Sequence, residues 1–272
     1  MTDLKGKVAV VLGASAEGGT GWGIAEGLAE AGVKVVVAAR SFEPLKKLAD
    51  KIGGVAIPCD GGDDKQITAL RDETLKRFGK IDIAVNSAAT ATLGLISEMT
   101  PALMQQAVQV NLFGMTYFVR DMAAVMKEGG SIILVSSMSV THPIFPHFAY
   151  AAAKSGLECL VRYAAIEYGP RRIRINGLRI ATVMSDFAKA YFNTPGVQER
   201  YNHEIPLGRI GQPEDMADAV KWLAGPAFIT GSMLDVSGGH QLGRYPFLSE
   251  LPDPSITYQD FGSLADREKN RS

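Results

Sequence analysis

The chain has 272 residues, in which 28 Lys and Arg nearly balance 29 Asp and Glu, and its formal net charge is −1 at pH 7. This balance argues against nucleic acid or an anionic membrane as the main partner, because both are bound through a surplus of basic side chains. With 46% hydrophobic and 21% charged residues, the composition is that of a globular protein with a sizeable core, and we expect a small-molecule ligand.

Short apolar segments rich in Val and Ile alternate with longer segments of helical periodicity along most of the chain. The expected strands are 8–12, 33–38, 55–57, 81–85, 132–135, 173–175 and 233–236. The expected helices include one beginning near Ile24, one around 45–52, and 64–78, 101–126, 150–168 and 213–223. The strands are apolar almost throughout, which is typical of strands covered on both faces. The alternation predicts an α/β fold: a single doubly wound domain of about seven parallel strands with helices on both faces.

A glycine-rich turn follows the first expected strand and leads directly into the first expected helix, over residues 13–25. This order leaves backbone N–H groups and the positive end of the helix dipole facing one point. The turn therefore predicts a site for the pyrophosphate of a dinucleotide, the alternative being a flexible loop. The cofactor contacts assigned to it are Gly13, Ser15, Thr20, Gly21, Trp22 and Gly23.

The second expected strand ends at Ala39, Arg40 and Ser41. Dinucleotide folds that prefer NAD usually carry an acidic residue here for the ribose 2′-OH, whereas a cation suits the 2′-phosphate of NADP. We therefore predict that NADP(H) is favoured over NAD(H), with Arg40 and Ser41 as contacts. The alternative is that Arg40 is a solvated charge at the end of a strand.

Tyr150 and Lys154 are four residues apart at the start of an expected helix, so they lie on the same face. A nearby ammonium should lower the pKa of the phenol, so that Tyr150 exchanges a proton near neutral pH. Reduction of a carbonyl by hydride needs such a proton donor for the oxygen. Ser137 ends the preceding strand segment, at the sheet edge where ligands bind in this architecture, and its hydroxyl is placed to hold the substrate oxygen.

These motifs, taken in order, resemble the short-chain dehydrogenase/reductase family over about residues 5–242. Four further segments carry the resemblance: 86–89 after the fourth strand, 110–114 with Asn111, and the closing segments 206–215 and 229–239. The resemblance implies a Rossmann-type fold with a nicotinamide cofactor, and a homo-oligomer, either a tetramer or a dimer.

The resemblance also implies a role for each matching residue. Tyr150 would be the general acid/base and Ser137 would hydrogen-bond the substrate oxygen. Lys154 would lower the pKa of Tyr150 and hold the nicotinamide ribose, and Asn111 would anchor a water that relays protons from Lys154. The further cofactor contacts implied are Asp60 at the adenine, Val183 and Ser185 at the carboxamide, and Asn86 and Ala88, besides Tyr150 and Lys154 themselves.

The sequence departs from the family pattern at three places. The glycine turn is four residues longer than usual and resembles that of enoyl-acyl-carrier-protein reductases. Those enzymes place their Tyr seven residues before the Lys, where this chain has His147, so we interpret the chemistry as carbonyl reduction. Asn-Ser-Ala-Ala at 86–89 replaces Asn-Asn-Ala-Gly, and Ile180-Ala181 replaces Pro-Gly, which changes side-chain bulk and backbone freedom beside the nicotinamide pocket.

The predicted function is that of an NADP(H)-dependent oxidoreductase that interconverts a ketone or aldehyde and a secondary or primary alcohol. The alternatives are a non-catalytic NADP-binding sensor or partner-binding module, and an epimerase or dehydratase that uses bound cofactor. Residues 184–205 resemble the family's substrate-covering loop. Their aromatic side chains favour a bulky or apolar substrate, although helices that merely pack on the sheet would look the same.

Residues 1–242 are expected to form the dinucleotide and substrate domain, and 243–272 a C-terminal tail that is either disordered or packed on a neighbouring subunit. Cys59 and Cys159 belong to no Cys-x-x-Cys pair, which fits a reducing compartment. The first apolar run, 8–12, is too short for a signal peptide, so we expect a cytoplasmic protein. His142 and His147 have no third ligand at metal spacing, and no metal site is predicted.

Overall fold

The structure is a computed structural model that describes residues 3–127, 129–185, 189, 191–247 and 250–251. Seven parallel strands form one sheet in the order β3-β2-β1-β4-β5-β6-β7. Their bounds are β1 Val8–Leu12, β2 Lys34–Ala39, β3 Val55–Pro58, β4 Ile83–Asn86, β5 Gly130–Ser137, β6 Ile173–Ile180 and β7 Met233–Val236. The predicted fold class, a single doubly wound α/β domain, is confirmed.

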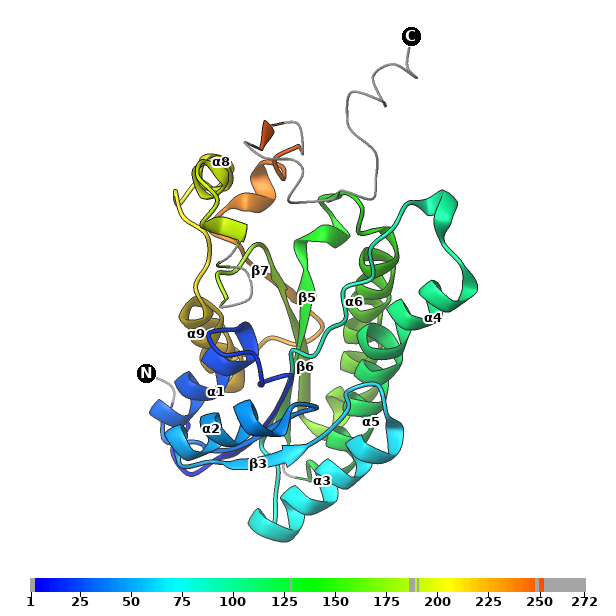
Figure 1. Ribbon diagram of the computed structural model, residues 1–272. Coiled ribbons are helices and arrows are strands. Elements are labelled where there is room, and N and C mark those ends of the chain that lie inside the picture. Colours follow the sequence, from blue (N-terminus) through cyan, green and yellow to red (C-terminus); the bar gives the residue numbers. More distant parts are fainter. Residues whose placement is uncertain (1–2, 128, 186–188, 190, 248–249, 252–272) are drawn as a thin grey trace.

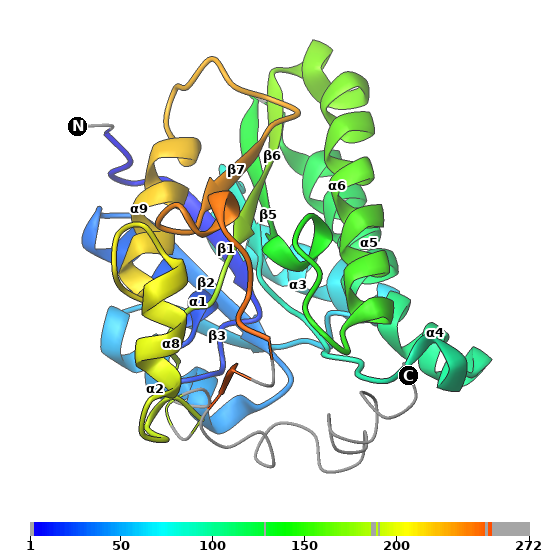
Figure 2. The ribbon, with the colours of Figure 1, turned by 90° about the horizontal axis from the view of Figure 1, so that it is seen from above.

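Helices cover both faces of this sheet (Figures 1 and 2). On one face lie α1 Thr20–Glu30, α2 Phe42–Ile52 and α9 Pro213–Ala224, and on the other α3 Asp64–Phe78, α5 Met115–Val125 and α6 Phe148–Tyr168. Two shorter helices are α4 Pro101–Val108 and α8 Val197–Glu204; the single-turn helices are η1 Ile96–Glu98, η3 Met138–Val140, η4 Gly169–Arg171 and η5 His240–Leu242. No described helix is both long enough and apolar enough to cross a membrane.

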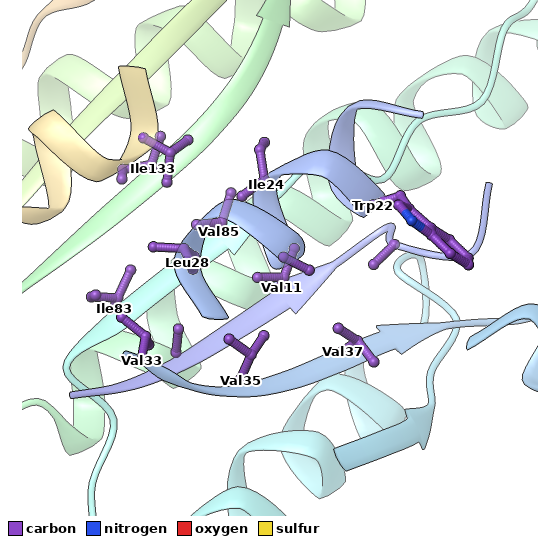
Figure 3. Close-up of a cluster of buried hydrophobic side chains, with 14 of the residues drawn as sticks. Val11, Trp22, Ile24, Leu28, Val33, Val35, Val37, Ile83, Val85 and Ile133 are labelled. Atoms are coloured by element: carbon purple, nitrogen blue, oxygen red, sulfur yellow. The ribbon is translucent and has the colours of Figure 1, made fainter. Parts of the chain in front are cut away.

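The period of two along each strand divides the apolar side chains between two cores. In β1, Ala9 and Val11 face the core under α1, α2 and α9, whereas Val10 and Leu12 face the core under α3, α5 and α6. Figure 3 shows the first of these cores, in which Ile24 of α1 packs over the strands. Because both faces are buried, the strands are apolar throughout, which is the pattern that the sequence displayed.

One predicted helix, 101–126, is divided in the structure. It consists of α4, a π-helical turn η2 Gln109–Gly114, and α5. At Gly114 a Cβ atom would lie 1.7 Å from the carbonyl oxygen of Gly61, so the chain approaches the loop after β3 more closely than any side chain permits. A π turn inserted in an α-helix is a frequent feature of functional sites. Here it carries Asn111.

The strand order reverses between β1 and β4, whose neighbouring positions include Leu12 and Asn86. In doubly wound sheets the crevice at the carboxyl ends of the strands on either side of such a reversal is where ligands bind. The same edge carries a third apolar group, which we call the edge cluster: Met138, Phe192, Val197, Tyr201, Ile205, Ile210, Tyr245 and Leu251.

Candidate active site

The glycine turn between β1 and α1 contains two glycines at which any other residue would force neighbouring backbone to move. Gly13 has φ +93°, and a Cβ there would lie 2.4 Å from the backbone nitrogen of Ala88. A Cβ at Gly21 would lie 2.3 Å from the carbonyl oxygen of Gly13. The N-cap of α1 is Gly19, and no side chain caps the helix. The first N–H groups of α1 are therefore left for a ligand, which is the arrangement expected for a phosphate site.

A cleft of about 490 Å³ runs along the carboxyl ends of the strands from this turn. It passes the end of β2, the loop after β3, the loop after β4 and the segment after β6. The predicted cofactor contacts that line it are Gly13, Ser15, Thr20, Gly21, Arg40, Ser41, Asp60, Ala88, Val183 and Ser185. Segments distant in the sequence are thus brought to one elongated cleft.

Five predicted cofactor contacts lie outside the lining of this cleft: Trp22, Gly23, Asn86, Tyr150 and Lys154. The side chain of Trp22 packs in the core (Figure 3), and its Nε1 donates to Glu26 at 2.7 Å. Gly23 faces α9, where a Cβ would lie 2.4 Å from Pro213, so its role is close packing of two helices. Asn86 is fully buried and its Oδ1 accepts from the backbone of Ala88 at 3.0 Å, which shapes the loop after β4.

Ser87 is a residue whose contribution the sequence did not reveal. Its hydroxyl donates to the carbonyl oxygen of Leu12 at 3.0 Å, and its backbone N–H donates to the same oxygen at 2.8 Å. These two bonds join the end of β4 to the end of β1, directly beneath the glycine turn. Ser87, which replaces the second Asn of the family's Asn-Asn-Ala-Gly motif, therefore connects β4 to β1 where the strand order reverses.

Asn111 is fully buried in the π turn, and its amide holds the loop after β4. Its Nδ2 donates to the carbonyl oxygens of Thr90 and Ala107, both at 2.8 Å, and its Oδ1 accepts from the backbone of Thr90 at 3.3 Å. With both amide atoms engaged, the side chain acts as a positioning group for the wall of the cleft formed by Thr90.

Ser137, Tyr150 and Lys154 are brought together at the end of β5 and the start of α6. The hydroxyl of Tyr150 is hydrogen-bonded to Ser137. The Nζ of Lys154 lies 5.7 Å from the centroid of the Tyr150 ring and donates to the carbonyl oxygen of Val135 at 2.8 Å. The predicted shared helix face is therefore present, and the strand end delivers Ser137 to it.

Ser139 is a second contributor that the sequence did not reveal. Its hydroxyl donates to the Oγ of Ser137 at 2.9 Å, and its backbone N–H donates to the same atom at 3.2 Å. Ser139 is buried, so these bonds restrict the rotation of the Ser137 hydroxyl. The repeated Ser in Ser-Ser-Met-Ser was the only signal for this arrangement in the sequence.

The predicted fall of the Tyr150 pKa is wrong for the ligand-free protein. Burial raises the pKa of Tyr150 to about 12, and the hydrogen bond from Ser137 opposes this only in part. Lys154 is 1% exposed, and the unfavourable burial of its ammonium lowers its own pKa to about 7. Lys154 could lower the pKa of the phenol only if it stayed fully charged, whereas the fold buries Lys154 completely and Tyr150 in part.

We expect the titration of Lys154 to make stability depend on pH. Its pKa is about 7 in the folded chain and returns to the ordinary value of 10.5 when unfolding exposes it to water, so the unfolded state binds more protons between these values. The free energy of unfolding should therefore rise with pH over this window. Urea denaturation of wild type and Lys154→Met at pH 7, 8 and 9 isolates this contribution, since Met keeps the volume of the stem. A difference between the two proteins that stays constant with pH would contradict the assignment.

A buried ion network lies one helical turn beyond Lys154. Glu158 is buried on α6 and accepts from Ser136 at 3.0 Å. Arg179 of β6 donates to both carboxylate oxygens of Glu158, at 3.0 and 2.7 Å, and to Asp235 of β7 at 2.8 Å. The network therefore joins β5, β6, β7 and α6 directly behind the Ser137, Tyr150 and Lys154 group.

His142 and His147 lie in the segment between Ser137 and Tyr150. Among the described residues, no three His, Cys, Asp or Glu side chains come together as a metal-binding group. His147 lies edge-on to Tyr150, with ring centroids 6.3 Å apart, and burial lowers its pKa. Its neutral ring therefore packs beside the phenol.

The edge cluster adjoins the Ser137 and Tyr150 group. Met138 directly follows Ser137, and Ala181, which lines the 490 Å³ cleft, also packs against the cluster. The predicted covering segment 184–205 contributes Phe192, Val197 and Tyr201, while Phe187 lies outside the described residues. The described part of the tail also belongs here: Tyr245 and Leu251 are members of the cluster, and Glu250 is bonded to Arg200 of α8.

Comparisons with known proteins agree with this geometry. A family model described as Enoyl-(Acyl carrier protein) reductase matches residues 13–241. The chain is 33% identical over 245 residues to the 7alpha-hydroxysteroid dehydrogenase of Escherichia coli K12, covering 87% of this chain and 94% of that one. It is 32% identical over 255 residues to versicolorin reductase stcU of Emericella nidulans, covering 87% and 96%. The crystal structure of an actinorhodin polyketide ketoreductase variant with NADPH has a TM-score of 0.80, 25% identity, and coverage of 87% and 97%.

Proposed function

The chain belongs to the short-chain dehydrogenase/reductase family, a family of oxidoreductases that act on carbonyl and alcohol substrates, and on this premise we propose its individual activity. The proposal is an NADP(H)-dependent oxidoreductase that interconverts a ketone or aldehyde and an alcohol, with Tyr150 as general acid/base. The observation that carries it is the Ser137, Tyr150 and Lys154 group at the end of β5, where Ser137 pairs with Ile180, a residue that lines the elongated cleft.

The cleft fits a dinucleotide. At one end, Gly13 and Gly21 allow the glycine turn to pack closely against neighbouring backbone, and α1 presents an uncapped N-terminus suited to a pyrophosphate. Arg40 and Ser41 lie where a 2′-phosphate would be recognised, and Asp60 where adenine would be held. Val183 and Ser185, which follow β6, also line the cleft, and we assign them to the nicotinamide end. When bound, the nicotinamide supplies or accepts the hydride.

In the direction of reduction, Tyr150 donates its phenolic proton to the carbonyl oxygen as the carbon receives hydride, which gives an alcohol and a phenolate. Ser137 donates a hydrogen bond to the same oxygen and orients it. A pKa of about 12 keeps Tyr150 protonated at neutral pH, so it is ready to act as the acid. Lys154 then returns a proton to the phenolate by way of water. We propose that the π turn that carries Asn111 holds this water.

The experiment that tests the proposal compares two reactions. A panel of ketones and an enoyl thioester is offered to the protein with NADPH, and cofactor oxidation is followed by absorbance. Ketone turnover without enoyl turnover is expected, because His147 occupies the position at which enoyl reductases carry their Tyr. Turnover of the enoyl thioester alone would assign the chain to the chemistry named in the description of its family model.

The substrate class that we propose is a bulky, largely apolar ketone. The names of relatives include a hydroxysteroid dehydrogenase and a polyketide ketoreductase. In this chain, the edge cluster and its partly buried neighbours Ile144, Met184 and Tyr191 offer an apolar wall next to Ser137 and Tyr150. Such a wall favours a large ring system over a short polar ketone.

Arg40 is expected to set the cofactor preference. It lines the cleft and is exposed, and its charge would favour the 2′-phosphate of NADP. Arg40→Ala should raise the KM for NADPH by about tenfold, the value of one charge-assisted hydrogen bond, with little change for NADH. Steady-state kinetics with both cofactors measure this. Equal KM values for NADPH and NADH in the wild type would show that Arg40 is a solvated strand-end charge.

We propose a homo-oligomer, a dimer or a tetramer, in the cytoplasm. Exposed apolar side chains include Tyr163 and Ile166, three residues apart on α6, and Trp222 and Phe228 at and after α9. Burial of such faces between copies would remove them from water. Light scattering should give a mass of at least two chains, and a monomer would contradict the proposal. Cys59 and Cys159 are free, as expected in a reducing compartment.

A further inference from the structure

The C-terminal strap, residues 243–247, is held firmly against α8. Arg244 donates to both oxygens of Glu250, at 2.6 and 2.7 Å, and Arg200 of α8 bonds Glu250 at 2.9 Å and Glu204 at 2.7 Å. The guanidinium of Arg244 also lies 4.5 Å from the centroid of the Phe247 ring. Such a network of alternating charges fixes the strap far better than one isolated surface pair would.

This anchoring positions Tyr245 in the edge cluster. His240 is fully buried; its Nε2 is 2.9 Å from the carbonyl oxygen of Arg244, and its ring contacts that of Tyr245 edge-on, with centroids 4.8 Å apart. Tyr245 belongs to the same edge cluster as Met138, the residue that follows Ser137. Its side chain is therefore fixed beside the end of β5, where the carbonyl of a substrate would be held.

The hydroxyl of Tyr245 has no hydrogen-bond partner among the described residues, and it is not one of the fully buried atoms without a partner, so it still reaches solvent although the residue is only 8% exposed. A tyrosine with an apolar, buried ring and an open hydroxyl can offer that hydroxyl to a ligand. Burial raises the pKa of Tyr245 well above its usual range, and a negative charge on Tyr150 raises it further, so the two phenols lie within electrostatic reach. The raised pKa keeps the Tyr245 hydroxyl protonated, and therefore a donor, at neutral pH.

We propose that Tyr245 is a specificity-determining residue whose hydroxyl donates a hydrogen bond to a second oxygen of the substrate, close to the carbonyl that is reduced. Its ring supplies part of the apolar wall for the carbon skeleton. The inference rests on the proposed function, and it narrows the substrate class to bulky ring ketones that carry an ether, hydroxyl or second carbonyl oxygen near the reacting group. Phe at this position would keep the wall and remove the donor.

Three bicyclic ketones of nearly the same shape test this inference. 1-Tetralone has no second oxygen, whereas isochroman-4-one and 4-chromanone each replace one CH₂ group with an ether oxygen, at different positions. Wild type, Tyr245→Phe and the control Tyr168→Phe, which removes a phenol at the far end of α6, are assayed with each ketone and NADPH. Thermal unfolding of the three proteins reports any general loss of structure.

Tyr245→Phe should lower the kcat/KM for at least one ether ketone relative to 1-tetralone by about tenfold, mainly through KM, and Tyr168→Phe should leave this ratio unchanged. A purely structural role would lower all three values together. If wild type reduces the ketones and the ratio is unchanged in Tyr245→Phe, the inference is overturned while the proposed function stands. If wild type reduces no ketone, both are overturned.

Discussion

Tyr150→Phe is expected to lower kcat for ketone reduction by about a hundredfold to ten-thousandfold, the range that a positioned general acid contributes. The ring of Tyr150 lies 5.7 Å from the Nζ of Lys154, and this packing survives in Phe. Only the proton donor and its hydrogen bond to Ser137 are removed. The affinity for NADPH should therefore stay within about tenfold of wild type, since this is the most that one lost neutral hydrogen bond is worth.

The measurement is single-turnover reduction with NADPH in excess, together with a fluorescence titration of NADPH. Ser137→Ala serves as the matched control, because it removes a hydroxyl from the same group and leaves the phenol in place. We expect its kcat to fall less than that of Tyr150→Phe, since Ser137 orients the substrate oxygen and does not supply the proton. Equal turnover by wild type and Tyr150→Phe would exclude Tyr150 as the general acid/base.

The largest effect on stability is expected at Arg179. Arg179→Met leaves the buried carboxylate of Glu158 without its bidentate partner, and breaking a buried pair in this way costs about 3–5 kcal/mol of unfolding free energy. It also leaves Asp235 without the bond at 2.8 Å. Urea denaturation monitored by circular dichroism gives the change, with the slope of the transition used to check that the unfolded state is unaltered.

A double-mutant cycle separates the charge from the packing. Glu158→Gln retains the shape of the side chain and an oxygen that accepts from Ser136, but removes the negative charge. Combined with Arg179→Met, it should recover part of the loss, because no unpaired charge is then buried. Strictly additive losses would mean that the two residues do not depend on each other. The double variant should still reduce ketones more slowly than wild type, since Glu158 lies on α6, the helix that also carries Tyr150 and Lys154.

The sequence was sufficient for the sheet and for most of the cleft, because both depend on local patterns. Residues such as Val10 and Val11 are buried on opposite faces of one strand, and this produces the continuous apolar runs. Gly13 and Gly21 are required because neighbouring backbone lies too close for a side chain, and a glycine-rich turn in the sequence indicates such a close approach. Ser137, Tyr150 and Lys154 meet because strand end and helix start are fixed by chain order.

The remaining features depend on contacts between distant segments. The division of 101–126 by a π turn follows from the contact of Gly114 with Gly61, which no periodicity encodes. The direction of the Tyr150 pKa shift depends on burial, which spacing alone does not give. Tyr245 reaches the edge cluster through a strap anchored by the charges of α8, and the expected disordered or neighbour-bound tail gave no hint of this.

The close packing of α1 on α9 has a consequence for the length of the ligand. Gly23 and Gly27 let α1 approach Pro213 and Ala217 so closely that a Cβ at either glycine would overlap α9. The first turn of α1 flanks one end of the cleft, and α9 starts two residues after Gly211, which pairs with Val183 at the other end. Both ends of the cleft are therefore attached to one closely packed pair of helices, α1 and α9, which fixes the distance between them. Substitutions in residues 191–205 can alter which substrate is covered without altering this distance between the two ends of the cleft.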